Sequence, residues 1–175
     1  MKKLSLLLFM LLAAAITYAQ NDSKNQRIID DSEEAKEGFL KDDPEMDKLF
    51  SSSYGYIILP NVGKGGLGVG GATGNGVAFE QGERIGFARM TQVTIGFQAG
   101  GQAYSEVVFF ENKEAFDRFK ESKIEMSAQV SAVAAASGAS LNAKYVDGVM
   151  VFTRTKGGLM YEASVGGQQF KFTEN

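Results

Sequence analysis

The feature that most constrains the fold is a glycine-rich run over residues 54–110. Thirteen of the chain's 21 glycines lie between positions 63 and 101, where Val, Ile and Phe alternate with the small residues. Glycine at this density suits closely approaching backbones, bulges and tight turns rather than a flexible linker. We therefore expect curved strands here, with Gly66, Gly68 and Gly70 packed closely against a neighbouring strand.

The first 19 residues have the pattern of a secretory signal peptide. Two lysines precede an apolar run over residues 4–16, and small residues at positions 17 and 19 fit a cleavage site. The apolar run is short for a membrane span. We expect cleavage before Gln20 and an exported protein that is periplasmic, associated with the outer membrane, or secreted.

Composition excludes many kinds of chemistry. The chain of 175 residues contains no cysteine and no histidine, so zinc–imidazole sites, Ser–His pairs, Cys–His pairs and disulfides are all excluded. No nucleophile–base pair is recognisable elsewhere. We therefore expect no enzyme, no metal and no cofactor.

The charge is unevenly distributed. Residues 21–50 hold ten acidic and five basic side chains, whereas residues 51–175 hold eleven of each. Nucleic-acid binding needs a basic footprint, which this chain lacks. We expect no nucleic-acid partner.

Residues 20–50 are predicted to form an amphipathic helical segment, in which residues 21–25 are expected to be frayed. A helix is expected over residues 26–41. A second short helix is expected from Asp43, with Asp43 as its cap and Pro44 at its first position. The residues expected to face inward are Ile28, Ser32, Ala35, Phe39, Met46, Leu49 and Phe50.

Residues 51–175 have the period of two that strands show, and form the predicted glycine-rich β domain. Strands are expected over residues 54–59, where Pro60 ends the strand, and on both sides of a hairpin turn at residues 81–83. A long strand over residues 91–104 should have an apolar face that includes Val93 and a polar face that includes Gln92. The further strands are expected at 107–110, 149–154, 159–165 and 168–172.

Two features complete the predicted fold. A helix is inserted after Asn112, its N-cap, with Phe116 and Phe119 reaching the core. Gly166-Gly167 is expected to form a turn that joins the last two strands. Residues 127–137 fit either a helix or a strand, and their small size favours a strand. The fold class is α+β: a mainly antiparallel β barrel or sandwich with glycine-rich curved strands, N-terminal helices and one inserted helix.

Two motifs that suggest chemistry are better explained by structure. The run contains G-x-G-x-x-G, but no helix follows to bind a phosphate, so a nucleotide site is not expected. Three carboxylates stand on predicted strands, and we expect each to be a solvated, outward residue. They are Glu80, Glu106 and Glu162.

Several motifs resemble the SYLF domain, closest to its exported bacterial branch, which is related to the fungal actin-binding SYLF proteins. The resemblance covers residues 30–172. It rests above all on Tyr54-Gly55-Tyr56, Val62-Gly63-Lys64-Gly65-Gly66, Ile95-Gly96-Phe97-Gln98 and Gly100-Gly101-Gln102.

The resemblance implies lipid binding without catalysis. Eukaryotic members bind phosphoinositide membranes, and some fungal members bind actin, a partner not expected in a bacterial envelope. The expected function is thus a non-catalytic lipid- or membrane-binding protein of the bacterial cell envelope. The alternative is an envelope protein–protein scaffold without a lipid ligand.

Five residues are candidates for lipid contact. An apolar pocket lined by residues such as Tyr56 and Phe97 would bind lipid with little dependence on salt, and the weak net charge favours this hypothesis. The alternative is a headgroup clamp made by Lys64, Arg84 and Arg89. The acidic polar face of the first helix argues against insertion of that helix into an anionic bilayer.

Overall fold

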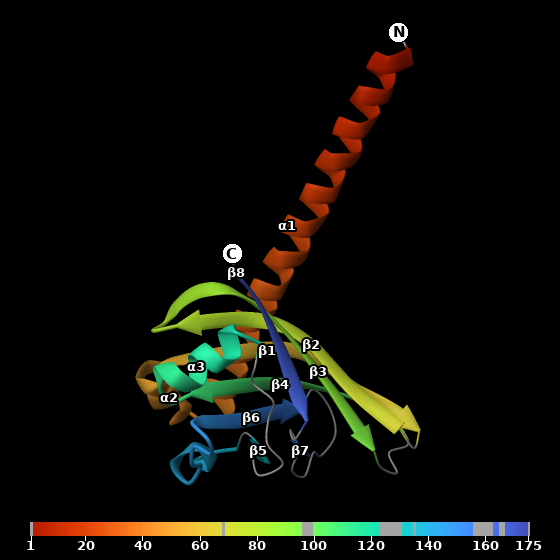
Figure 1. Cartoon of the computed structure of the whole chain (residues 1–175). Coiled ribbons are helices and arrows are strands. Elements are labelled where there is room, and N and C mark those ends of the chain that lie inside the picture. The colour runs from red at the N-terminus through yellow and green to blue at the C-terminus, as the bar shows by residue number, and fades with distance from the viewer. Residues whose placement is uncertain are drawn as a thin grey trace.

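The computed structural model describes residues 2–67, 69–95, 100–122, 131–134, 136–155, 163–164 and 167–174, and over residues 2–21 only the course of the backbone. The fold is α+β (Figure 1). The helices are α1 (Lys2–Asp42), α2 (Met46–Ser52) and α3 (Lys113–Lys120), with a 3-10 turn at Ala139–Leu141. The strands are β1 (Gly55–Leu67), β2 (Val69–Glu80), β3 (Glu83–Ile95), β4 (Gly100–Phe110), β5 (Ser131–Ala134), β6 (Val149–Thr155), β7 (Ala163–Ser164) and β8 (Gln168–Glu174).

The strands form one sheet in the order β7-β5-β6-β4-β1-β2-β3-β8. The six strands from β6 to β8 in this order pair antiparallel, and β5 pairs parallel with β6. The strand prediction for residues 127–137 is therefore confirmed at Ser131–Ala134, and residues 123–130 lie outside the described part.

The sheet is strongly curled. Its two edge strands, β7 and β8, are joined by residues 165–167 alone, so Ser164 and Gln168 are at most about 14 Å apart. Across the interior, the Gln168 side chain on β8 donates a hydrogen bond to Glu106 on β4. Among the described residues no ladder joins the two edges, so closure into a barrel is not confirmed.

The predicted hairpin at residues 166–167 is wrong. Strand β7 pairs with β5, and β8 pairs with β3 at the other edge of the sheet. Strand β8 instead forms a ladder of seven residue pairs with β3, so the glycine pair lies in the connection between two edges of a curled sheet.

The sheet buries a separate apolar cluster on each face. The face that α3 covers, called the interior here, includes Phe116, Phe119, Phe110 and Phe170, whose rings contact one another across the curl. Helices α1 and α2 cover the outer face. The residues of the outer cluster are Ala35, Phe39, Met46, Phe50, Tyr56, Ile58, Val107, Phe109, Met150 and Phe152.

The helical stripe of α1 is confirmed, because Ser32, Ala35 and Phe39 are buried. The predicted fraying of residues 21–25 is wrong, since α1 runs unbroken from Lys2 and projects away from the sheet (Figure 1). No proline or glycine precedes Gly38 to interrupt it. Over the residues with described side chains, no helix is long and apolar enough to cross a membrane.

The predicted cap role of Asp43 is only partly right: its carboxylate accepts a hydrogen bond of 3.2 Å from the N–H of Glu45, the residue before α2, but it also has a second role. Helix α2 begins at Met46, and Pro44 lies outside it. The Asp43 carboxylate is buried and accepts hydrogen bonds from the backbone N–H groups of Gly138 and Ser140, at 3.1 and 2.8 Å. It therefore ties the α1–α2 junction to the 3-10 turn.

Two strands differ from the sequence expectation. Pro60 does not end β1 but stands at a β-bulge, where a missing N–H is tolerated. The predicted strand over residues 91–104 is two strands, β3 and β4, which flank the β1–β2 hairpin. Its faces are also reversed, because Gln92 is 3% exposed and Val93 is 74% exposed.

Other expectations are confirmed. The β2–β3 hairpin turns at Gln81-Gly82, both at positive φ. Asn112 caps α3 by accepting a hydrogen bond from the N–H of Ala115. Gly68 lies outside the described residues, and the close packing of Gly66, Gly68 and Gly70 stays a prediction. Gly76, on the same strand as Gly70, does approach a neighbouring backbone closely, since a Cβ there would lie 2.0 Å from the carbonyl oxygen of Ile58.

Candidate functional site

Of the two apolar candidates, the structure describes Tyr56. Tyr56 is 3% exposed, and its ring packs against Phe50, Phe79 and Phe109 on the outer face. The tyrosine cannot meet a lipid unless this core opens. Phe97 lies outside the described residues.

The three basic candidates are not brought together. Lys64 pairs with Ala72 of the interior cluster and thus lies on the interior side, whereas Arg89 stands between two interior residues, Ala88 and Met90, and points outward. Arg84 is five residues from Arg89 on the same strand, about 16 Å away. One headgroup cannot contact all three.

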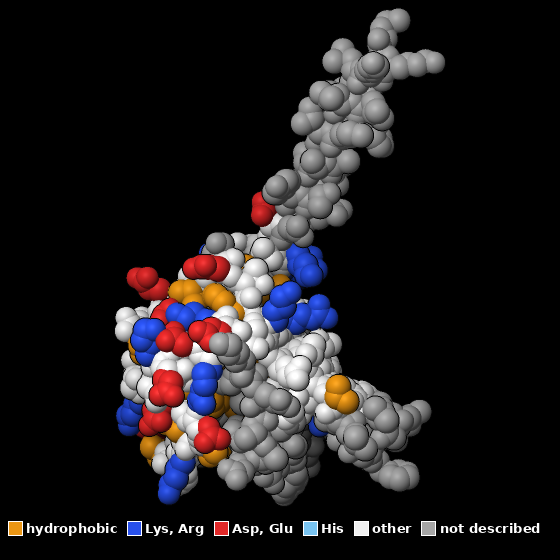
Figure 2. All heavy atoms as spheres, viewed as in Figure 1, with side chains coloured by type: hydrophobic (Ala, Val, Ile, Leu, Met, Phe, Trp, Pro, Cys, Tyr) orange, Lys and Arg blue, Asp and Glu red, His pale blue; other side chains and the backbone are white. Residues whose placement is uncertain are grey.

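Arg89 instead belongs to a different basic group. It lines a hollow of about 330 Å³ between the base of α1 and strands β2, β3 and β8. We call this hollow the basic pocket. Its cations are Lys24, Arg89 and Lys171, and Ile28 and Phe87 add apolar surface. Figure 2 shows Lys and Arg side chains gathered where α1 leaves the domain.

The fold explains how these cations meet. Arg89 and Lys171 are direct partners in the β3–β8 ladder, so their side chains share a face with Cβ atoms about 5 Å apart. Lys24 comes from α1, one turn before Ile28, which lines the same hollow. The contact between α1 and the outer face is supported by a hydrogen bond of 3.0 Å from Asn61 to Asp31.

The electrostatics of the basic pocket favour an anion. None of the described residues that line it is acidic, and among the described residues none of its three cations forms an ion pair. Like charges directly opposite on neighbouring strands destabilise a sheet. A bound phosphate or carboxylate would relieve this repulsion.

Sequence reasoning missed Lys24 and Lys171. Lys24 fell in a stretch that we expected to be frayed. The alternation of Phe170, Lys171 and Phe172 does indicate that Lys171 points outward. Its pairing with Arg89 depends on the β3–β8 register, between strands about 80 residues apart, which no local pattern encodes.

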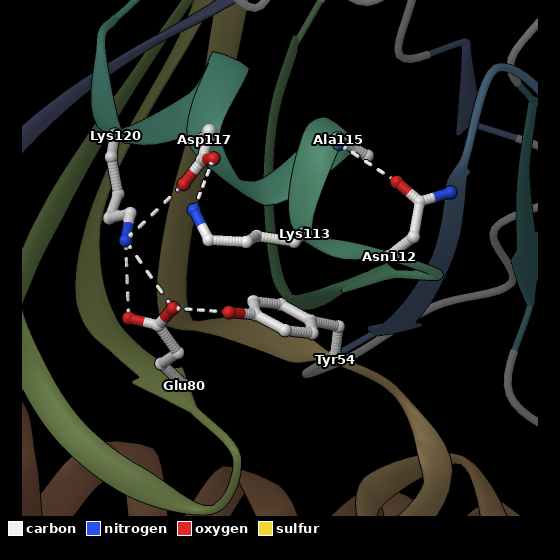
Figure 3. Close-up of polar contacts among 7 residues, drawn as sticks. All are labelled: Tyr54, Glu80, Asn112, Lys113, Ala115, Asp117 and Lys120. Atoms are coloured by element: carbon white, nitrogen blue, oxygen red, sulfur yellow. Dashed lines mark hydrogen bonds and ion pairs between the residues drawn. The ribbon is translucent and has the colours of Figure 1, made fainter.

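A second charged group serves the structure rather than a ligand. Glu80 accepts a hydrogen bond of 2.9 Å from the Tyr54 hydroxyl and pairs with Lys120 at 3.2 Å, as Figure 3 shows. Asp117 pairs with Lys113 and Lys120 on α3. This network fastens α3 to β2, and the predicted solvated role of Glu80 is only partly right.

The prediction for Glu106 is wrong. This carboxyl is fully buried on the interior face, and Gln168 Nε2 donates to its Oε2 atom at 3.0 Å. Burial raises the pKa of Glu106 to about 7, although the bond from Gln168 acts in the opposite direction. Glu162 lies outside the described residues.

The described residues contain no group of three or more Asp, Glu, His or Cys side chains that could bind a metal. The buried carboxylates Asp43 and Glu106 are bonded to backbone N–H groups and to an amide, respectively. The basic pocket is the best candidate for a ligand.

Two comparisons place the chain among known proteins. Residues 91–175 match the Ysc84 family model, described as "Las17-binding protein actin regulator". The chain is also 29% identical over 133 residues to Beta cell expansion factor A of Aeromonas veronii, a match that covers 75% of this chain and 50% of that protein. The chain thus spans about half the length of this relative. Together these matches confirm the resemblance found in the sequence, and the chain belongs to the SYLF, or Ysc84, family.

Proposed function

We propose that this protein is a non-catalytic lipid-binding protein of the bacterial cell envelope, and that the basic pocket holds an anionic headgroup at a membrane surface. The observation that carries this proposal is the convergence of Lys24, Arg89 and Lys171 without an acidic neighbour in the described lining. Membership of the SYLF family supports a binding role.

The shape and composition of the basic pocket suit a lipid headgroup. Its volume of about 330 Å³ is near the lower end of the range for small-ligand sites. The cations would contact a phosphate, while Ile28 and Phe87 would contact the first carbons of the acyl chains. Of the headgroup clamp predicted from the sequence, this assignment retains Arg89. Lys64 and Arg84 are replaced by Lys24 and Lys171.

Part of the acidic surface of α1 lies far from the basic pocket. The exposed residues Glu33, Glu34 and Glu37 come about three turns after Lys24, and that distance of about 15 Å exceeds the screening length at physiological ionic strength. Asp22, Asp30 and Asp31 are closer to Lys24 along α1, and Asp31 accepts a hydrogen bond from Asn61. These three carboxylates reduce the positive potential, so the proposal rests on the three cations that line the pocket itself.

Flotation with vesicles tests the proposal. The protein should bind phosphatidylglycerol-containing vesicles and bind pure phosphatidylcholine vesicles much less. Each cation near an anionic surface contributes about 1 kcal/mol, so Arg89→Ala/Lys171→Ala should weaken binding about 30-fold.

Lys41→Ala/Lys144→Ala is the matched control. It removes the same charge from two exposed residues outside the pocket, and it should bind like the parent. Equal loss in both double variants would contradict a local site. Absence of binding to every vesicle would favour the envelope scaffold instead.

A further inference from the structure

The interior of the curled sheet is aromatic where α3 contacts it, and buried polar side chains lie beyond these aromatic residues. There several of the inward side chains are polar: Glu106 on β4, Thr153 on β6 and Gln168 on β8 are each 2% exposed or less. We call these three residues, with Tyr104 and Gln92, the interior polar cluster. The bond from Gln168 to Glu106 is a side-chain link across the interior between an edge strand and a central strand.

Two acceptor atoms of the interior polar cluster lack a hydrogen-bond donor. The Oε1 atoms of Glu106 and Gln168 are both buried without a hydrogen-bond partner. Both atoms are acceptors, and an ionised carboxylate offers acceptors only. A buried acceptor without a donor costs stability. A proton on Glu106 would turn one carboxyl oxygen into the missing donor.

No described cation faces Glu106 closely enough to favour its ionised form. The ladder partners of Glu106 are Leu59 on β1 and Thr153 on β6, and its hydrogen-bond partner is Gln168 on β8. Tyr104 lies two residues before it on the same face, and Gln92 on β3 is the ladder partner of Gln168. All of these side chains are uncharged at neutral pH. The described cation on the interior face is Lys64 on β1. It pairs with Gln102, four residues from Glu106 and about 13 Å along the strand.

We propose that Glu106 is a proton-operated latch between β4 and β8: the folded, curled sheet holds this carboxyl protonated, and its ionisation loosens the edge strand β8 from the interior. Strand β8 also carries Lys171 of the basic pocket. Loosening of β8 would therefore also affect the basic pocket. This consequence rests on the proposed function, whereas the latch itself does not.

The direction of the pH effect follows from the raised pKa. Glu106 titrates near 4.5 in an unfolded chain and at about 7 in the folded one. The folded state thus binds the proton more tightly, so stability falls as pH rises from about 4.5 to about 7 and is level above that. Between pH 5 and 8 the folding equilibrium constant should fall on the order of 50-fold through this group.

Urea denaturation between pH 5 and 8 tests the latch. Glu106→Gln keeps the shape of the protonated carboxyl and supplies a permanent donor, so its stability should vary little over this range and exceed that of the parent at pH 8. The control Glu111→Gln changes an exposed carboxylate next to β4 and should keep the parent's decline. An unchanged decline in Glu106→Gln would overturn the proposal.

Two measurements on the parent protein keep the proposal testable if Glu106→Gln fails to fold. Carboxyl ¹³C NMR should show one glutamate with a midpoint near 7, and a set of midpoints all near 4.5 would refute the latch. Hydrogen exchange, corrected for the intrinsic effect of pH, should be faster at the β8 amides at pH 8 than at pH 6. Equal exchange at the two pH values would also refute it.

Discussion

At the residue scale, glycine allows strand β2 to cross the bulge of β1. A Cβ at Gly76 would lie 2.0 Å from the carbonyl oxygen of Ile58, and one at Gly86 would lie 2.3 Å from that of Thr173. Both contacts are to backbone, which cannot turn aside as a flexible side chain can. The density of glycine in the sequence therefore reflects close backbone approach at particular positions.

Gly76→Ala should destabilise the protein by about 1–3 kcal/mol, because the added methyl group overlaps the β1 backbone. Gly63→Ala is the control, since a Cβ at this exposed strand position would meet no atom within 4 Å. Urea denaturation of both variants measures the difference. If Gly76→Ala were as stable as Gly63→Ala, close approach would not explain the glycine run.

At the element scale, a single buried carboxylate connects two segments about 95 residues apart. Burial raises the pKa of Asp43, but the N–H groups of Ser140, Gly138 and Glu45 outweigh that effect and hold the pKa below its usual value. A group with a lowered pKa stabilises the fold above its unfolded value near 3.8, and this stabilisation is lost as pH falls through the folded value.

Asp43→Ala should therefore cost about 2–3 kcal/mol at pH 7, because the N–H groups of Ser140, Gly138 and Glu45 lose their acceptor, and that of Ser140 is buried. Asp47→Ala, at an exposed position in the first turn of α2, should cost less than about 1 kcal/mol. Thermal unfolding of the two variants gives the comparison. A similar Tm for both would contradict the linking role of Asp43.

The sequence predicts the helices and strands better than it predicts which strands pair with each other. Helix α3 with its Asn112 cap and the hairpin at Gln81-Gly82 follow from local patterns, and both are confirmed. The pairing of β8 with β3 depends on the curl of the whole sheet. The burial of Glu106 and Gln92 was missed because alternation shows which residues share a face, and apolar neighbours such as Val93 suggested the wrong face as the inner one.

Contacts between segments distant in sequence also decided how much of the candidate site could be predicted. Arg89 was predicted as a headgroup contact, but its companions were not, because they come from α1 and from β8, which are far from Arg89 in the sequence. Tyr56 was proposed to line an apolar pocket, yet the helices α1 and α2 cover its face of the sheet. Local patterns do not show which face a helix distant in sequence will cover.

At the scale of the whole molecule, the predicted cleavage before Gln20 would leave the basic pocket complete. Every residue that lines it follows position 20, and α1 is continuous across the predicted cleavage site. We expect the protein from envelope fractions to begin at Gln20, as measured by intact mass. A cytoplasmic species that retains residues 1–19 would contradict export.

The dependence of membrane binding on salt tests the central claim most directly. Attraction between the basic pocket and an anionic surface is screened as ionic strength rises, whereas burial of apolar surface is not. Cosedimentation with phosphatidylglycerol-containing vesicles should therefore show a steep loss of binding between about 0.05 M and 0.5 M NaCl. The loss should be shallower for Arg89→Ala/Lys171→Ala than for Lys41→Ala/Lys144→Ala. Binding that stays constant across this range would contradict the claim and favour an apolar contact.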